Sequence, residues 1–154
     1  MENMDSLFIT EASRDDLPAL ADLLTELFTL ESDFVPDRAR QIAGLGLILD
    51  NPALGCLFVL RDEAEVVGMA NALITVSTAE GGRVLLLEDV IVRQSHRGGG
   101  AGGQLVEHVL AWARARGMSR VTLLADRDNG PALAFYEHLG FQLSAMKVLR
   151  KSLA

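Results

Sequence analysis

Cysteine and histidine are scarce in this chain, and their scarcity limits the chemistry it can perform. Cys56 is the only cysteine, so no internal disulfide can form. The three histidines, His96, His108 and His138, lie too far apart for the ligand spacing of a zinc site, so we expect no metal. A chain without disulfides fits a reducing compartment, and we expect a cytoplasmic protein.

Long apolar runs and a basic leader are also missing. No stretch approaches the roughly 20 apolar residues that a membrane-spanning helix needs. The N-terminal segment carries Glu2 and Asp5 where a secretory signal would carry a basic region followed by an apolar run. We therefore expect neither a membrane partner nor a secretory signal.

Positive charge is in short supply, with 14 Lys and Arg against 21 Asp and Glu and a formal net charge of -7. Nucleic-acid affinity depends on Lys and Arg that neutralise phosphates, so we expect no nucleic-acid partner. One basic island, Arg93-Gln94-Ser95-His96-Arg97, stands out, and no acid lies between Arg93 and Gly102. A local cationic site on an acidic chain favours a small anionic ligand.

The 154 residues, 49% of them hydrophobic, suffice for one domain with a core, and we expect a single domain over 1–154. The apolar spacing predicts an α/β (α+β) fold, in which a mixed sheet carries helices on both faces. Strands are expected at 7–10, 56–60, 66–76, 83–92 and 121–125, with one or two more in 141–153. Helices are expected from Ser13 through Phe28, over 37–49, behind the glycines near Gly103, and over 132–139.

A glycine-rich turn, Arg97-Gly98-Gly99-Gly100-Ala101-Gly102-Gly103, lies between a strand and a helix. Glycines let the backbone approach a ligand closely, and the following helix directs its unpaired N–H groups and positive dipole end at the loop. Binding of a pyrophosphate explains such a junction better than a merely flexible turn does. Arg97, His96 and Arg93 would add positive charge at its mouth.

Two named phosphate motifs fit less well. The P-loop requires Lys and then Ser or Thr where this chain has Gln104 and Leu105, so it is excluded. The spacing Gly98-x-Gly100-x-x-Gly103 matches a dinucleotide fingerprint, and Asp126 lies at a suitable distance, but the motif comes late in the chain.

Three segments in order resemble the GCN5-related N-acetyltransferase (GNAT) superfamily. They are the strand Leu87–Val92, the turn Arg97–Gly102 as R-x-x-G-x-G, and the stretch Asn129–Phe141 as N-x-x-A-x-x-F-Y-x-x-x-G-F. The resemblance implies a sheet of six to seven strands with about four helices, and acetyl-CoA as the co-substrate. It covers Arg83–Phe141, whereas the preceding half fits the variable acceptor-facing helices by order alone.

The resemblance also implies roles for individual residues. The backbone groups of Val90, Ile91 and Val92 would pair with the pantetheine arm as an added strand does. Asn129 would hydrogen-bond the pantetheine region, and Tyr136 would lie near the cofactor sulfur. The turn would hold the pyrophosphate through Arg97, Gly98, Gly99, Gly100, Ala101, Gly102 and Gly103.

Acetyl transfer needs a base for the amine, and Glu88 and Asp89 are carboxylates in an otherwise apolar strand. Burial would raise a carboxyl pKa toward neutrality, which suits a general base. Strand alternation predicts that the two side chains face opposite ways, and the resemblance favours Glu88 as the base. For Asp89 the plainer interpretation is a cap or an ion pair, with substrate binding as the alternative.

Tyr136 is the only tyrosine, and a phenol can protonate the departing thiolate. The plainer interpretation is packing beside Phe135 and Phe141. The spacing from Asn129 to Tyr136 favours the catalytic role.

Acidic residues gather where the resemblance implies the acceptor site: Glu26, Glu31, Asp33 and Asp37. They would attract a cationic amine, whether a small molecule or a peptide. A solvated acidic surface is the simpler interpretation. The late strands could also pair across a homodimer.

Two other functions stay open. One is an acetyl-CoA sensor of the same fold without catalysis, and the other is a dinucleotide-binding protein that uses the same glycine loop. Binding of coenzyme A without thiol release would favour the first, and stabilisation by NAD but not by coenzyme A would favour the second.

Overall fold

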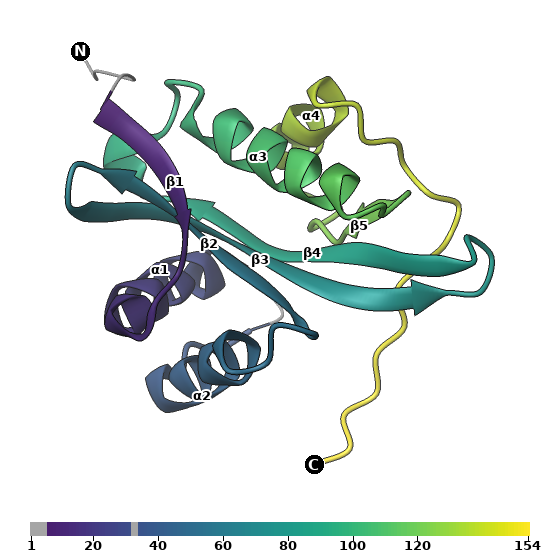
Figure 1. Cartoon of the computed structure of the whole chain (residues 1–154), viewed down its shortest axis with the longest axis horizontal. Helices are drawn as coiled ribbons and strands as arrows, with labels where there is room; N and C mark the ends of the chain where they lie inside the picture. Colours follow the sequence, from purple (N-terminus) through teal and green to yellow (C-terminus); the bar gives the residue numbers. More distant parts are fainter. Residues whose placement is uncertain (1–5, 32–33) are drawn as a thin grey trace. The chain divides into compact units, whose positions relative to one another are not determined.

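The computed structural model describes residues 6–31 and 34–154. The chain divides into two compact units, Met1–Leu124 and Ala125–Ala154. The first unit holds the sheet and three of the α-helices, and the second holds one short helix and the C-terminal segment (Figure 1). The single domain over 1–154 stays a prediction.

The first unit is built on five strands that lie side by side in chain order (Figure 1). Neighbouring strands are antiparallel from β1 to β4, and β5 runs parallel to β4. The mixed sheet expected from the sequence is therefore confirmed. The strands are β1 (Leu7–Glu11), β2 (Gly55–Asp62), β3 (Glu65–Ser77), β4 (Gly82–Val92) and β5 (Val121–Leu123).

Helices cover both faces of this sheet. On one face lie α1 (Leu17–Leu30), which follows a 3-10 turn η2 (Arg14–Asp16), and α2 (Arg38–Leu49). On the other lies α3 (Ala101–Ala115), which follows a second 3-10 turn η3 (Gln94–His96) (Figure 1). None of the described helices is both long and apolar enough to cross a bilayer.

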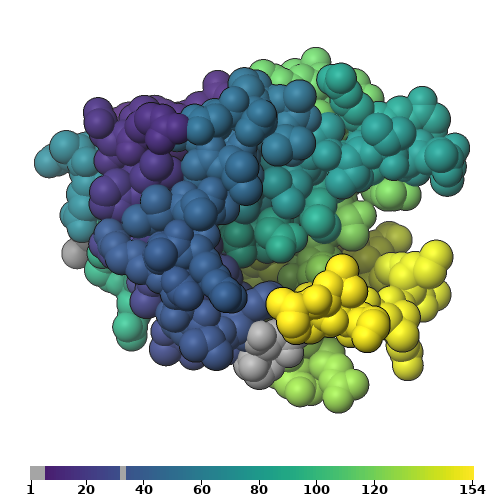
Figure 2. Space-filling model, turned by 90° about the horizontal axis from the view of Figure 1, so that it is seen from below, coloured from purple at the N-terminus to yellow at the C-terminus, as the bar shows by residue number. Residues whose placement is uncertain are grey.

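Helical spacing of leucines explains why α1 lies where it does. Leu17, Leu20, Leu23 and Leu24 recur on one stripe and are buried against the sheet, as the apolar period predicts. Figure 2 looks onto the layer formed by α1 and α2, which are coloured purple to blue. The hydrophobic core cluster between this layer and the sheet comprises Leu17, Leu20, Ala21, Leu23, Leu24, Leu45, Leu57, Val59, Val66, Met69 and Ile91.

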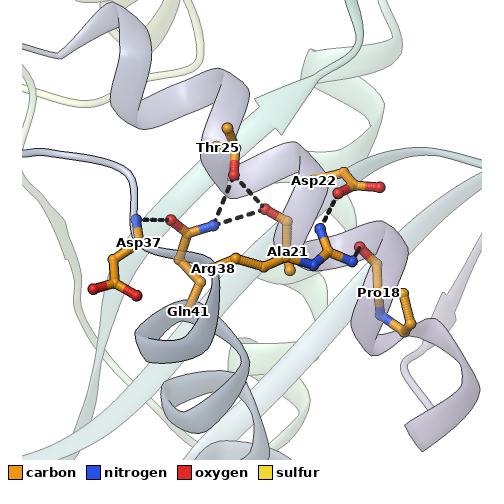
Figure 3. Close-up of polar contacts among 7 residues, drawn as sticks. All are labelled: Pro18, Ala21, Asp22, Thr25, Asp37, Arg38 and Gln41. Carbon is orange, nitrogen blue, oxygen red and sulfur yellow. Dashed lines mark hydrogen bonds and ion pairs between the residues drawn. The ribbon is translucent and has the colours of Figure 1, made fainter.

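A buried glutamine fixes α2 against α1 (Figure 3). Gln41 Nε2 donates to the carbonyl of Ala21 at 2.8 Å and to Thr25 Oγ1 at 2.9 Å. Its Oε1 accepts from the N–H of Asp37 at 2.8 Å, so every polar atom of the amide group has a partner. Because satisfied buried polar groups specify one arrangement of neighbouring helices, Gln41 sets the register of this layer.

The second unit contains α4 (Gly130–His138), and it corrects one expectation. Asn129 begins the helix by accepting a hydrogen bond from the N–H of Ala132 at 3.1 Å. The strands predicted for 141–153 are wrong, since no strand is assigned there, and the sheet has five strands rather than six to seven. A strand needs a sheet edge for its hydrogen bonds, and this unit contains no other strand.

Candidate active site

The strand β4 has a neighbouring strand on both edges over only part of its length. It pairs with β3 over its whole length but with β5 only at Leu85, Leu86 and Leu87. From Glu88 to Val92, therefore, one edge of β4 has no neighbouring strand among the described residues. An unpaired strand edge can hydrogen-bond to a further extended chain, so this half of β4 presents backbone groups suited to a ligand that pairs as a strand does.

The hydrogen-bond ladder decides which backbone groups reach that edge. The N–H of Arg93 donates to the carbonyl of Val67 in β3 at 2.7 Å, and successive residues of a strand direct their backbone groups to alternate sides. Ile91, which lies opposite Met69, therefore faces β3, while Val90 and Val92 face the open edge. Ile91 is thus not placed to contribute backbone groups to a ligand there.

A β-bulge lies where the two halves of β4 meet, and it alters the expected placement of the carboxylates. Asn71 lies opposite Asp89, yet Ala72 lies opposite Leu87, so Glu88 is the extra residue. Such an insertion breaks the simple alternation of side chains that the sequence argument assumed. Glu88, which the resemblance favours as the base, is exposed while Asp89 is partly buried, and the catalytic role of Glu88 stays a prediction.

Asp89 has the perturbed carboxyl group of this region. Burial raises its pKa to about 6; the hydrogen bond from Asn71 acts to lower it, and the charge of Glu88 raises it further. Asn71 Nδ2 donates to Asp89 Oδ2 at 3.0 Å. Within residues 6–31 and 34–154, Asp89 neither caps a helix nor joins an ion pair, the two plainer interpretations of its sequence position.

Asn71 was not identified from the sequence. It is a lone polar residue within the apolar run of β3, and it is 6% exposed. That isolation was the available signal, since a buried amide in a strand needs a partner.

The glycine turn has the conformation that its composition favours. Gly98 and Gly100 have φ of 87° and 86°, in the left-handed region that side chains with a Cβ rarely adopt. Gly100 is the N-cap of α3 and has no side chain, so no side-chain hydrogen bond caps this helix. The N–H groups of its first turn therefore point, with the positive end of the helix dipole, toward the loop.

The cations beside the turn are already engaged within the chain. Arg93 Nε donates to the carbonyl of Val66 at 2.9 Å. Arg97 Nε donates to the carbonyl of Val92 at 2.7 Å, and its Nη2 pairs with Glu26 of α1 at 2.6 Å. Arg97 therefore carries less free charge than the sequence suggested, and it occupies one acceptor of the open β4 edge.

His96 has a comparable role. Its Nε2 lies 2.8 Å from Asp62 Oδ2, at the end of β2. Hydrogen bonds from Ser6 and His96 lower the pKa of Asp62. This contact ties the start of the glycine turn to the β2–β3 hairpin.

Two acids of the cluster around the end of α1 make structural contacts. Glu26 pairs with Arg97, and Asp37 caps α2 by accepting from the N–H of Arg40 at 3.2 Å. Glu31 is the C-cap residue of α1, and Asp33 lies outside the described residues. The charges of Glu26 and Asp37 are thus engaged in structural contacts, which weakens the simplest electrostatic argument for a cationic acceptor.

The second unit presents the last two predicted site residues on α4. The side-chain oxygen of Asn129 is used as the helix cap. Tyr136 packs edge-on to Phe135 and Phe141, with ring centroids 5.0 and 5.7 Å apart. The packing expected as the plainer interpretation is present, and the catalytic role of Tyr136 stays a prediction.

Residues set aside as structural have the expected environments. His108 and His138 are exposed, and Cys56 is buried in β2. Trp112 packs edge-on against Phe58, with ring centroids 5.4 Å apart. In the described part of the chain, no group of three or more His, Cys, Asp or Glu could hold a metal ion.

Comparison with known proteins gives this geometry a family context. The profile of the Acetyltransferase (GNAT) family matches residues 17–141. N-alpha-acetyltransferase 80 of Mus musculus is 35% identical over 129 residues, which is 77% of this chain and 38% of that protein. Glucosamine 6-phosphate N-acetyltransferase of Trypanosoma brucei brucei is 33% identical over 87 residues, 56% of this chain and 57% of that protein. The chain thus spans less than two thirds of the length of these relatives.

Solved structures share the fold. A possible acetyltransferase from Clostridium difficile 630 superposes with a TM-score of 0.87 at 20% identity, over 96% of this chain and 98% of that one. The aminoglycoside N-acetyltransferase AAC(6')-Iy in complex with CoA gives a TM-score of 0.81 at 19% identity, over 96% and 95%. With a profile match over most of its length, the chain belongs to the GNAT family of acetyltransferases.

Proposed function

We propose that this chain transfers an acetyl group from acetyl-CoA directly to a primary amine. The observation that carries the proposal is the continuity of two features: the open edge of β4 from Glu88 to Val92, and the uncapped N-terminus of α3 a few residues later. An extended arm that ends in a pyrophosphate matches both features in order. The family profile favours coenzyme A over a dinucleotide.

The residues present fit this ligand. Val90 directs its N–H and C=O to the open edge, and Val92 offers its N–H there while its carbonyl holds Arg97. The backbone of Gly98 through Gly103 supplies N–H donors without side chains that would obstruct an anion. Ala101 begins α3, and Arg97 adds charge shared with Glu26. The family resemblance implies a further contact from the side-chain N–H₂ group of Asn129, the N-cap residue of α4, whose side-chain oxygen caps that helix.

Acetyl-CoA supplies an acetyl group on a thioester. The chain must take a proton from the amine, donate to the carbonyl oxygen, and protonate the departing thiolate. Glu88 and Asp89 are the carboxylates at the bulge that can take the proton, and Tyr136 is the phenol that can supply one. The backbone N–H of Val90, at the open edge, is a donor for the carbonyl oxygen.

The acceptor is proposed to be a primary amine of a small molecule or a peptide. Names of relatives support this breadth: they include N-alpha-acetyltransferase 80 and streptothricin acetyltransferase, and a fold neighbour was solved with the aminoglycoside sisomicin. Glu31 and Asp33 would favour a cationic acceptor, and their contribution is secondary to Asp89. A homodimer stays a prediction.

The test is calorimetric titration with coenzyme A and acetyl-CoA, together with thiol release across an amine panel. Gly100→Glu should abolish binding, because it places an anionic side chain at the N-terminus of α3 and strains a φ of 86°. Gly117→Glu is the matched control, since Gly117 has a φ of 74° with nothing within 4 Å of its added Cβ at the other end of α3. The control should bind coenzyme A at full strength.

Other outcomes separate the alternatives. Binding without thiol release from any amine would identify a sensor, and stabilisation by NAD but not by coenzyme A would identify a dinucleotide protein. Tyr136→Phe should lower turnover while it spares coenzyme A binding. Unchanged turnover would leave Tyr136 with a packing role only.

A further inference from the structure

A buried amide oxygen without a donor lies beside the bulge of β4. Asn71 is 6% exposed, and it lies on the central strand β3 between Leu57 of β2 and Asp89 of β4. Its Nδ2 donates to Asp89, but within residues 6–31 and 34–154 its Oδ1 accepts no hydrogen bond. Buried acceptors are nearly always satisfied, so such an orphan calls for a donor from outside the protein, either a water or a ligand.

The backbone places this pair on a defined face of the sheet. The ladder is regular from Met69 to Asn71, so alternation directs the side chains of Asn71 and Asp89 to the same face as Met69 and Ile91. Met69 and Ile91 belong to the core cluster under α1 and α2. The side chains of Asn71 and Asp89 therefore lie on the face of the sheet that α1 and α2 cover. They lie at the strand position where the open edge of β4 begins.

We propose that Asn71 and Asp89 together hold the acceptor's amine nitrogen, with Asn71 Oδ1 accepting one N–H and Asp89 taking the proton that the ammonium group must lose. This assignment rests on the proposed acetyl transfer and goes beyond it by naming the proton acceptor and its positioning partner. A primary ammonium group has three N–H donors, so it can satisfy the orphan oxygen and the carboxylate at the same time.

The proton and electron balance is complete. The ammonium group gives one proton to the Asp89 carboxylate, which leaves a neutral amine with a free electron pair. That pair forms the bond from nitrogen to the acetyl carbon, and the carbon–sulfur bond breaks with its electrons on sulfur. The thiolate takes its proton from the proposed acid, Tyr136, and the second proton that the nitrogen loses as the amide forms balances it, while Asp89 returns its own proton to solvent.

The charges around Asp89 are consistent with this role. Glu88 is the neighbour on its own strand, and it raises the pKa of Asp89. On α1, which packs against β3 and β4, Asp22 and Glu26 are paired with Arg38 and Arg97.

The remaining charges on the packed strands and on α2 are also accounted for. On β2, Arg61 pairs with Asp16, and Asp62 with His96. On α2, which packs against β2, the cations are Arg38 and Arg40, and each pairs with an aspartate. The charged residue of β3, Glu65, begins that strand, six positions before Asn71. No arginine or lysine on these elements therefore pairs with the Asp89 carboxylate.

The first test compares kcat/KM for a reactive amine between wild type and Asp89→Asn, with coenzyme A binding measured in parallel. Asp89→Asn should lower kcat/KM by about 100-fold or more, the usual scale of a lost general base, while coenzyme A binding stays intact. An Asp89→Asn variant with wild-type kcat/KM would overturn the proposal. A wild-type protein that neither binds coenzyme A nor releases thiol would instead overturn the proposed acetyl transfer.

The pH profile separates a catalytic carboxylate from a structural one. In the wild type, kcat/KM should rise with pH through about 6, as the Asp89 carboxyl ionises. Glu88→Gln removes a negative neighbour, so the rise should move to lower pH. Glu88 is exposed, which makes this variant safe for folding. A rise that does not move in Glu88→Gln would contradict the assignment to Asp89.

Asn71→Leu tests the positioning residue. It removes the acceptor oxygen, so KM for the amine should increase by about tenfold. It also removes the hydrogen bond that lowers the Asp89 pKa, so the rise of kcat/KM should move to higher pH. Gln41→Leu, at another buried amide, is the control: it should lower the melting temperature without moving the profile. If Asn71→Leu behaves as Gln41→Leu does, Asn71 has only a structural role.

Discussion

Two aspartates of the first unit, Asp16 and Asp89, have pKa values shifted in opposite directions. Asp16, at the start of α1, accepts from Arg61 Nη2 at 2.8 Å and from the N–H of Ser13 at 2.8 Å. Burial acts to raise its pKa, but the bonds and charge of Arg61 and the bonds from Ser13 lower it overall. In the described part of the chain, the side chain of Asp89 has the neutral amide of Asn71 as its one donor, and burial raises its pKa to about 6.

The difference teaches what each region is arranged to do. A carboxylate with an arginine and a backbone donor stays ionised at neutral pH, and its charge is used to join β2 to the turn before α1. A carboxylate with one neutral donor can gain and lose a proton near neutral pH, as acid–base catalysis requires. The same side chain therefore stabilises the fold at one end of the sheet and is available for chemistry at the bulge.

The largest expected effect on stability is at Asp16. Asp16→Asn should lower the free energy of unfolding by about 3 kcal/mol, because it leaves the partly buried guanidinium of Arg61 without its counter-charge. Urea denaturation measures the change. Acetyl transfer per folded molecule should stay at the wild-type level, in contrast to Asp89→Asn.

A surface pair provides the matched control for this change. Asp22 pairs with Arg38, and their side chains are 58% and 50% exposed. Asp22→Asn should therefore lower stability by less than about 1 kcal/mol. Equal losses in Asp16→Asn and Asp22→Asn would show that burial does not distinguish the two pairs.

The two aspartates should also respond to pH with opposite signs. The folded pKa of Asp16 is lowered, so its stabilisation is present above its unfolded pKa near 3.9 and is lost as pH falls through the lower folded value. The folded pKa of Asp89 is raised to about 6, so its ionisation weakens the fold progressively between about pH 4 and pH 6.

Asp89→Asn removes that penalty. The difference in free energy of unfolding between Asp89→Asn and wild type should be roughly 2 kcal/mol more favourable to the variant at pH 8 than at pH 4, with solvent screening allowed for. Urea denaturation at both pH values checks the gain. A gain that is larger at pH 4 than at pH 8 would contradict the raised pKa.

Much of this architecture follows from the sequence because it depends on local signals. The leucine spacing of α1 and the glycines before α3 each predict an element that the structure contains, and the helix expected over 37–49 is present as α2. The glycine turn was likewise identifiable, since glycine is the residue type that adopts a positive φ without strain, as Gly98 and Gly100 do.

Which of the two carboxylates is buried depends on register, which the sequence does not specify at a bulge. Alternation alone does not say which of Glu88 and Asp89 is buried, and the extra residue at Glu88 leaves Asp89 paired with Asn71. The late strands failed for a similar reason, since strand formation depends on a partner edge distant in sequence. The partners of Arg97 and Asp16 are equally non-local, at separations of 71 and 45 residues.

The smallest expected effect concerns Glu26, whose ion pair with Arg97 is half-exposed, at 34% and 38%. Glu26→Gln should change stability by less than about 1 kcal/mol. It releases the charge of Arg97 beside the glycine turn, so coenzyme A should bind about two- to fivefold more tightly at low salt, and the gain should shrink at high salt. Glu107→Gln, an exposed acid on α3, controls for the general loss of negative charge and should change the affinity less. If Glu26→Gln and Glu107→Gln bind coenzyme A equally well, Glu26 does not reduce the charge that Arg97 offers to the ligand. The ion pair of Glu26 with Arg97 then has only a structural role, like the ion pair of Asp16 with Arg61.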